Sequence, residues 1–125
     1  MAQHHSPQFL KLVEETKERI KEIGRDGLKR DLENKSSLHL IDVREASEYA
    51  AGRIPGSKNL CKGIIERDIE TTIPDLNADI VLYCGGGFRS ALAADNLQKM
   101  GYTRVRSLAG GWRDWNEARY PTEKP

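Results

Sequence analysis

Cys84 and Arg89 are the residues of this 125-residue chain whose types and spacing point most directly to chemistry. They stand in the segment Tyr83-Cys84-Gly85-Gly86-Gly87-Phe88-Arg89-Ser90. A cysteine thiolate is a nucleophile, consecutive glycines at positive φ can converge several N–H groups on one anion, and arginine is a permanent cation. The segment therefore predicts nucleophilic sulfur chemistry on an anionic substrate.

The sequences on either side of this loop predict a strand before it and a helix after it. Residues 79–83 form a short apolar run, and the apolar residues after Phe88 recur at helical spacing as far as Met100. Cys84 is therefore expected in a loop that opens a helix. The first N–H groups of a helix lack intrahelical partners and carry partial positive charge, which favours a thiolate over a thiol. The alternative is an inert, buried cysteine in a common type of glycine turn.

The rest of the chain predicts strands and helices in alternation. Apolar spacing predicts an amphipathic helix over residues 8–23 and further helices over 27–34, 45–51, 64–69, 88–100 and 112–118. Short apolar runs predict strands over residues 38–43, 59–60, 79–83 and 104–108. This alternation predicts an α/β fold with a mainly parallel central sheet and helices on both faces. Ligands of such sheets bind beyond the carboxyl ends of the strands, so residues 42–44, 84–89 and 109–111 are expected to share one mouth.

Composition excludes several classes of function. The 20 basic and 19 acidic residues give a net charge of +1, which does not support a general nucleic-acid-binding surface. No apolar run approaches the length of a membrane span, so no membrane partner is expected. The two cysteines, Cys61 and Cys84, have no metal-like spacing, so neither a metal site nor a disulfide framework is expected. A reducing, cytoplasmic location is the simplest expectation.

Four motifs along the chain resemble the rhodanese domain in its single-domain form. They are Ile41-Asp42-Val43-Arg44-Glu45, Gly52 with Ile54-Pro55-Gly56-Ser57, Tyr83-Cys84 with Gly87, Arg89 and Ser90, and Gly110-Gly111 with Trp115. Their order and spacing are preserved from about residue 36 to residue 121. The resemblance implies a rhodanese-like α/β fold over 36–121. Residues 1–35 are then an N-terminal helical extension packed on or next to that domain, and 122–125 are a tail.

The resemblance also implies a sulfurtransferase that works without a cofactor. Cys84 is the expected catalytic residue, taking sulfur from a small anionic donor such as thiosulfate and passing it as a persulfide to a thiol or cyanide. The expected substrate-binding residues are Gly85, Gly86, Gly87, Phe88, Arg89 and Ser90, with Arg89 as the cation that receives the donor.

Two residues after the second predicted strand are expected to support the cysteine loop. Arg44 is expected to form an ion pair with Glu48 or another carboxylate, and Asp42 is expected to accept hydrogen bonds from amides of the loop. Near the carboxyl end of the chain, Trp115 is expected in the core, and Trp112 is a candidate for the mouth of the pocket.

Two alternative functions stay open. Gly85 stands where thiosulfate-active members often have a second arginine, which favours a persulfide carrier or sulfide-binding module that docks on a cysteine desulfurase or acceptor protein. A cysteine-dependent phosphatase or arsenate reductase is disfavoured, because those enzymes use Cys-x5-Arg and this chain has the shorter Cys84-x4-Arg89. Cys61 is either an inert thiol or a thiol that resolves the persulfide on Cys84 as a disulfide.

Overall fold

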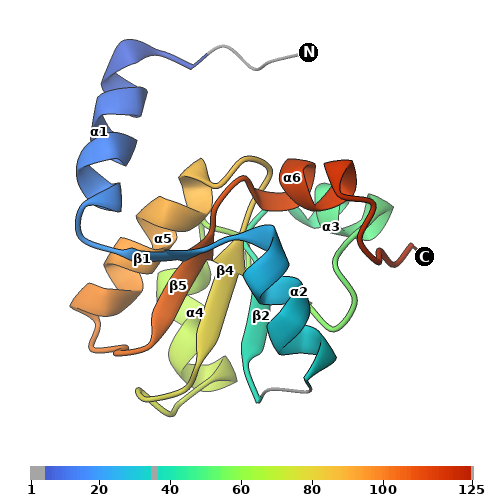
Figure 1. Cartoon of the computed structure of the whole chain (residues 1–125). Coiled ribbons are helices and arrows are strands. Elements are labelled where there is room, and N and C mark those ends of the chain that lie inside the picture. The colour runs from blue at the N-terminus through green and yellow to red at the C-terminus, as the bar shows by residue number, and fades with distance from the viewer. Residues whose placement is uncertain (1–4, 35–36, 125) are drawn as a thin grey trace.

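Five parallel strands form a sheet in the computed structural model, which describes residues 5–34 and 37–124. The domain boundary predicted between residues 35 and 36 lies outside the described residues. In chain order the strands are β1 (Lys21–Ile23), β2 (His39–Asp42), β3 (Lys58–Asn59), β4 (Ile80–Tyr83) and β5 (Val105–Leu108). Their order across the sheet is β1-β5-β4-β2-β3, and every neighbouring pair is parallel (Figure 1).

Helices cover both faces of this sheet. They are α1 (Pro7–Lys17), α2 (Arg25–Glu33), α3 (Ala46–Ala51), α4 (Ile65–Thr72), α5 (Phe88–Lys99) and α6 (Gly111–Glu117). Helices α4 and α5 lie on one face of the sheet, and α2 and α6 lie on the other (Figure 1). Buried residues of each pair of helices form a core cluster with the sheet. The predicted α/β fold, with a parallel sheet covered on both faces, is confirmed.

Strand β4 is buried on both faces, as expected of a central parallel strand. Ile80 and Leu82 pack toward α4 and α5, whereas Val81 and Tyr83 pack toward α2 and α6. All four side chains are fully buried. Burial of an apolar side chain of this size contributes roughly 1.5–3 kcal/mol, so β4 is firmly held and fixes the start of the loop that follows it.

The first helix is shorter than the sequence predicts. Residues 21–23, expected at the end of a helix over 8–23, form β1 instead. The spacing of Ile20 and Ile23 fits a helix, but the backbone of this segment pairs with β5, and Ala109 N–H donates to the carbonyl of Ile23 at 2.9 Å. Gly24 follows β1 directly and precedes the first residue of α2.

The carboxyl ends of the central strands meet at one edge of the sheet. Val43 N–H donates to the carbonyl of Tyr83 at 2.9 Å, which joins the segment after β2 to the end of β4. Trp112 N–H donates to the carbonyl of Cys84 at 2.8 Å, which joins the start of α6 to the same loop. The segments after β2, β4 and β5 therefore meet at one edge as predicted, but of residues 42–44, 84–89 and 109–111 only members of 84–89 line the pocket found there. Within residues 5–34 and 37–124, the helices are too short or too polar to cross a lipid bilayer.

Candidate active site

The thiol of Cys84 lies directly beyond β4, where the first turn of α5 begins. Its Sγ atom accepts a hydrogen bond from Gly87 N–H at 3.1 Å and one from Ser90 N–H at 3.4 Å. The residue is only 1% exposed, so few other groups can solvate the sulfur. Backbone N–H groups at a helix start favour negative charge, and the geometry therefore suits a thiolate or a persulfide anion.

Glycines allow this loop to pass close to the start of α6. Among the three consecutive glycines, only Gly87 has a positive φ, of 95°, so the expectation of three left-handed residues was too broad. A side chain is also excluded at Gly111, where a Cβ would lie 2.4 Å from the carbonyl oxygen of Cys84. The loop is further held by Arg113 N–H, which donates to the carbonyl of Gly85 at 3.0 Å.

Two buried hydroxyl groups stand behind the sulfur. Ser90 Oγ lies 3.5 Å from Cys84 Sγ and 2.8 Å from Ser107 Oγ. Both serines are fully buried. A hydroxyl that donates a hydrogen bond to the sulfur stabilises negative charge on it, as the two N–H groups do.

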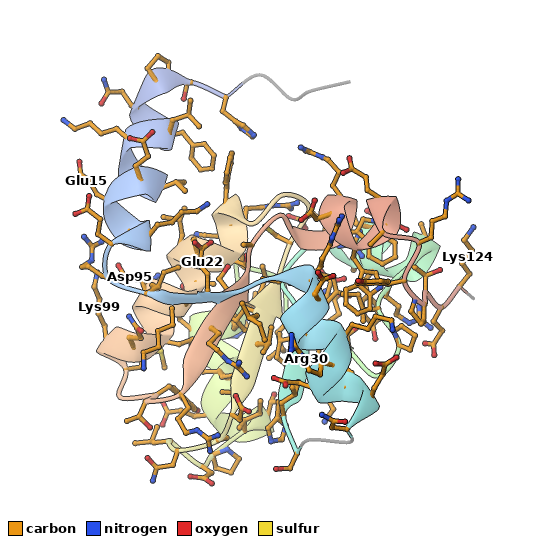
Figure 2. All side chains as sticks on the ribbon, in the orientation of Figure 1. Glu15, Glu22, Arg30, Asp95, Lys99 and Lys124 are labelled. Carbon is orange, nitrogen blue, oxygen red and sulfur yellow. The ribbon has the colours of Figure 1, made fainter. Side chains whose placement is uncertain are left out.

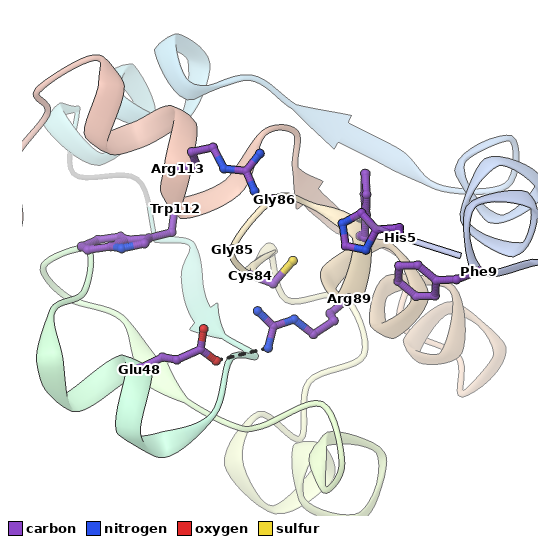
Figure 3. Close-up of a pocket in the computed structure, with 10 residues that line it drawn as sticks. His5, Phe9, Glu48, Cys84, Gly85, Gly86, Arg89, Trp112 and Arg113 are labelled. Carbon is purple, nitrogen blue, oxygen red and sulfur yellow. Dashed lines mark hydrogen bonds and ion pairs between the residues drawn. The ribbon is translucent and has the colours of Figure 1, made fainter. Parts of the chain in front are cut away.

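A pocket of about 680 Å³ opens above the thiol (Figure 3). The residues that line it come from α1, α3, the cysteine loop, α5 and α6, together with the segment before α1. They are His5, Phe9, Glu48, Cys84, Gly85, Gly86, Phe88, Arg89, Trp112 and Arg113. Five of the seven residues predicted to act on substrate thus line the pocket, whereas Gly87 and Ser90 contact the sulfur through their N–H groups from behind it.

Arg89 reaches the pocket but is paired there with a carboxylate. Its Nη1 atom lies 3.2 Å from Glu48 Oε1, and the two side chains are 35% and 40% exposed (Figure 3). Partial burial by itself raises the pKa of Glu48, but the hydrogen bonds from Arg89 and from Glu45 N–H, with the nearby positive charges, lower it overall. Partial burial opposes the charge of Arg89, yet Glu48 and Cys84 raise its pKa and keep it a cation.

Arg44 has a different partner from the first one predicted. It does not pair with Glu48, but binds Asp42 through two nitrogens at 2.7 and 3.0 Å, with side chains 4% and 0% exposed. Asp42 was expected to accept hydrogen bonds from the cysteine loop; its carboxylate instead accepts them from Arg44, including the backbone N–H at 2.9 Å. Burial opposes the charge of Arg44, but Asp42 raises the pKa of the guanidinium overall.

Arg44 still supports the site, by a route that the sequence did not predict. It donates to the carbonyl of Gly52 at 2.7 Å, and its guanidinium carbon lies 4.8 Å from the ring of Trp112. The expectation that Trp112 lines the mouth is confirmed, and Trp115 is buried in the core as predicted.

Sequence reasoning missed Glu48, His5, Phe9 and Arg113 as lining residues. The available signal for Arg113 was its place directly after Trp112, beyond the end of β5. His5 and Phe9 carried no such signal, because they reach the pocket only through the packing of α1. Cys61 is not among the lining residues, and its thiol lies 3.8 Å from Asn59 Oδ1. In the described part of the chain, no group of three or more His, Cys, Asp or Glu side chains is placed to hold a metal ion.

The chain is similar in sequence to a known protein family. The family model for the rhodanese-like domain matches residues 25–118. The thiosulfate sulfurtransferase PspE of Escherichia coli is 37% identical over 76 residues, which cover 61% of this chain and 72% of that protein. The putative sulfur carrier protein YrkF of Bacillus subtilis is 33% identical over 96 residues, 77% of this chain, and the chain spans about half the length of YrkF (51%).

A solved structure similar over almost the whole chain comes from Rhodopseudomonas palustris. It is a protein of unknown function and possible tyrosine phosphatase, with a TM-score of 0.85 and 28% sequence identity. The alignment covers 98% of this chain and 99% of that one, so it includes the segment before residue 25, where the family match begins.

Proposed function

Since the chain belongs to the family of rhodanese-like domains, which includes thiosulfate sulfurtransferases, we propose that it is a sulfurtransferase with Cys84 as its catalytic residue. Cys84 takes a sulfane sulfur from an anionic donor such as thiosulfate, holds it as a persulfide and passes it to a thiol or cyanide. The observation that carries this proposal is the environment of the sulfur, where two N–H groups and a hydroxyl face Cys84 Sγ at the base of the pocket.

The proposed transfer consists of two substitutions at sulfur, each of which forms one bond and breaks one, so it needs no cofactor. The Cys84 thiolate attacks the outer sulfur of thiosulfate, a new S–S bond forms, and the old S–S bond breaks with its electron pair on the departing sulfite. Cyanide then attacks the outer sulfur of the persulfide, thiocyanate leaves, and the thiolate is restored. Gly87 N–H and Ser90 N–H stabilise the negative sulfur in the resting state.

A persulfide carrier is the second candidate, and one observation favours it. Arg89, the residue expected to receive a small anionic donor, is partly neutralised by Glu48 at 3.2 Å. The similarity to YrkF, itself a putative sulfur carrier protein, agrees with this candidate. On this alternative a cysteine desulfurase or another persulfide supplies the sulfur, and an acceptor protein removes it.

We extend the proposal to a reducing location such as the cytoplasm, because Cys61 and Cys84 are both free thiols.

The phosphatase named for the Rhodopseudomonas palustris protein is a weaker candidate for this chain. Its support is the structural similarity alone. The loop here places Arg89 five residues after Cys84, one residue closer than the Cys-x5-Arg loop that wraps a phosphate. Hydrolysis of p-nitrophenyl phosphate that disappears in Cys84→Ser would favour the phosphatase.

An intact-protein mass spectrum tests the leading proposal. The protein is incubated briefly with thiosulfate under non-reducing conditions, then measured before and after addition of cyanide, for the wild type, Cys84→Ser and Cys61→Ser. We expect one added sulfur atom in the wild type and in Cys61→Ser, removed by cyanide, and none in Cys84→Ser. Sulfur added to Cys84→Ser would contradict the proposed mechanism. A wild type that gains sulfur only from a persulfidated cysteine desulfurase would favour the carrier.

A further inference from the structure

One wall of the pocket is aromatic and is built partly from residues outside the family match. His5 and Phe9 lie against Phe88, the first residue of α5, with ring centroids 4.8 Å apart for His5 and Phe88 and 6.1 Å apart for Phe9 and Phe88. His5 and Phe9 are 5.3 Å apart. We call these three residues the aromatic wall. Figure 3 shows His5 and Phe9 on one side of Cys84, with Trp112 and Arg113 on the other.

The aromatic wall is held in place by contacts between α1 and α5. Arg19, just after α1, binds Asp95 at 3.0 Å, and the Asp95 side chain is only 9% exposed. Lys99 contacts the same carboxylate at 3.4 Å, and both acceptor and lysine lie where α5 runs beside the end of α1 (Figure 2). Gln98 donates to the carbonyl of Arg19 at 2.9 Å, and Val13 of α1 is buried. The wall is therefore a built part of the fold.

The opposite side of the pocket carries an unpaired cation. Arg89 and Arg113 both extend over the cysteine loop. A Cβ built on Gly85 would lie 3.3 Å from Arg89 Nη2, and a Cβ built on Gly86 would lie 3.7 Å from Arg113 Nη2. Arg89 is bound to Glu48. Arg113 is exposed, and its guanidinium has no hydrogen bond or ion pair with any of residues 5–34 and 37–124. Arg113 is thus the arginine available to an incoming anion.

From the aromatic wall and Arg113 together, we propose that the pocket selects an organic sulfur donor, with an anionic head for Arg113 and an apolar body for the aromatic wall. This inference rests on the proposed sulfur transfer. A pocket of about 680 Å³ is within the range of roughly 300–1,000 Å³ typical of sites for small organic ligands. Thiosulfate consists of a few polar atoms and leaves the aromatic wall unused.

An organic thiosulfonate, R–SO2–S⁻, has the required chemistry and is a stable probe. The Cys84 thiolate attacks its terminal sulfur, a new S–S bond forms, and the bond to the sulfonyl sulfur breaks with its electron pair on the leaving sulfinate, R–SO2⁻. An organic persulfide, R–S–S⁻, reacts in the same way and releases the thiolate R–S⁻. Both donors leave the same Cys84 persulfide that thiosulfate would give.

The test compares benzenethiosulfonate with thiosulfate in the full chain, because the two share the reacting sulfur and differ in the aromatic body. We expect Phe9→Ala to lower kcat/KM for benzenethiosulfonate roughly fivefold and to change that for thiosulfate less than twofold. Arg113→Gln should raise KM for both donors, about fivefold, with little change in kcat. Leu12→Ala is the matched control, because Leu12 lies on the same helix, is 49% exposed and does not line the pocket.

Equal losses for both donors in Phe9→Ala, or no loss for either, would overturn the inference while leaving sulfur transfer intact. Calorimetry of benzenethiosulfonate binding to Cys84→Ser measures the affinity of the pocket without sulfur transfer, because this variant lacks the nucleophile. Binding that weakens when Phe9→Ala is added supports the donor class even if the wild type forms no persulfide, in which case the proposed function alone fails. Binding of benzenethiosulfonate no tighter than that of thiosulfate contradicts the selectivity.

Discussion

The hydroxyl of Ser107 lies 2.8 Å from the hydroxyl of Ser90, and both are buried behind the thiol of Cys84. Within the described residues, Ser107 Oγ has no other hydrogen-bond partner. If Ser90 donated to Ser107, the Ser107 hydrogen would have no acceptor in a fully buried place, which is costly. The arrangement that leaves neither buried hydroxyl hydrogen without an acceptor has Ser107 donating to Ser90 and Ser90 donating to Cys84 Sγ, 3.5 Å away.

Replacing Ser107 by Ala should make Cys84 less reactive by removing the group that orients the Ser90 hydroxyl. A hydrogen bond contributes about 0.5–1.5 kcal/mol, so we expect alkylation by iodoacetamide at pH 7 to slow roughly two- to tenfold. The rate is measured in a Cys61→Ser background. Ser57→Ala is the control, because Ser57 is also buried but contacts Tyr83 and Ile54 instead. Wild-type reactivity in Ser107→Ala would show that the hydroxyl pair does not act on the sulfur.

Replacing Arg44 by Met should destabilise the fold. The change leaves the carboxylate of Asp42, which has no exposed surface, without its ion-pair partner. Removal of one member of a buried pair costs about 3–5 kcal/mol, and urea unfolding at pH 7 measures the loss. Arg67→Met breaks the exposed pair of Arg67 and Asp68 and should leave stability nearly unchanged. Similar losses in the two variants would mean that burial of the Asp42–Arg44 pair does not matter.

Replacing Glu48 by Gln should improve the use of thiosulfate. The substitution removes a negative charge from the pocket and frees Arg89, while Gln can still accept the hydrogen bond from Glu45 N–H that caps α3. An effect on the order of 1 kcal/mol corresponds to a roughly fivefold lower KM, with kcat unchanged. Glu123→Gln, which alters the distant pair with Arg53, is the matched control. An unchanged or higher KM in Glu48→Gln would refute this role for its charge.

Acid should weaken the attachment of α1 through Asp95. The hydrogen bond from Arg19 lowers the pKa of Asp95, burial opposes this, and the charges of Arg19 and Lys99 reinforce it. The pKa of Asp95 is lower in the folded state than its ordinary value of 3.8. At a pH above 3.8 the charged carboxylate therefore stabilises the fold in full, and this stabilisation is lost as the pH falls through the lowered pKa of the folded state. Urea unfolding from pH 7 to pH 3 should therefore show Asp95→Asn less stable than wild type at pH 7, with the difference closing below about pH 3.8. A difference independent of pH would rule out the charge of Asp95 as its cause.

Gly111→Ala should disrupt the loop that holds Cys84. A Cβ there would lie 2.4 Å from the Cys84 carbonyl oxygen, on a backbone with a φ of 56°. We expect a loss of stability of about 1–3 kcal/mol and little persulfide formation. Gly63→Ala is the control, because a Cβ at Gly63 meets nothing within 4 Å. Persulfide formation at the wild-type rate in Gly111→Ala would show that the close approach of α6 is not needed.

The sequence predicted what is encoded locally. Helical and strand spacing located α2 to α6 and β2 to β5 within a few residues, and the glycine loop placed Cys84 at a strand end. The exception was β1, three residues long, whose partner β5 lies almost at the other end of the chain. Ile20 and Ile23 continue the helical spacing of the residues before them, so only the tertiary pairing with β5 defines this strand.

The contacts of the site were harder to predict than its position. Sequence alone named Arg89 but not its partner Glu48, and it gave no reason to place Phe9 beside Phe88. Both contacts join segments that come together only when helices pack. The Asp42–Arg44 pair could be anticipated in part, because the two residues are neighbours in sequence and a carboxylate partner for Arg44 was expected.

The pairing of β1 with β5 also affects how the protein is assembled on the ribosome. Synthesis proceeds from the N-terminus, so β1 emerges before the other four strands of the sheet and must wait for β5, the last of the five. Until β5 is made, β1 has no neighbouring strand to pair with. The end of α1, which leads directly into β1, is then not yet fixed to the sheet. The sheet edge next to α1 is therefore completed after the central strands β2 and β4 can already have paired with each other.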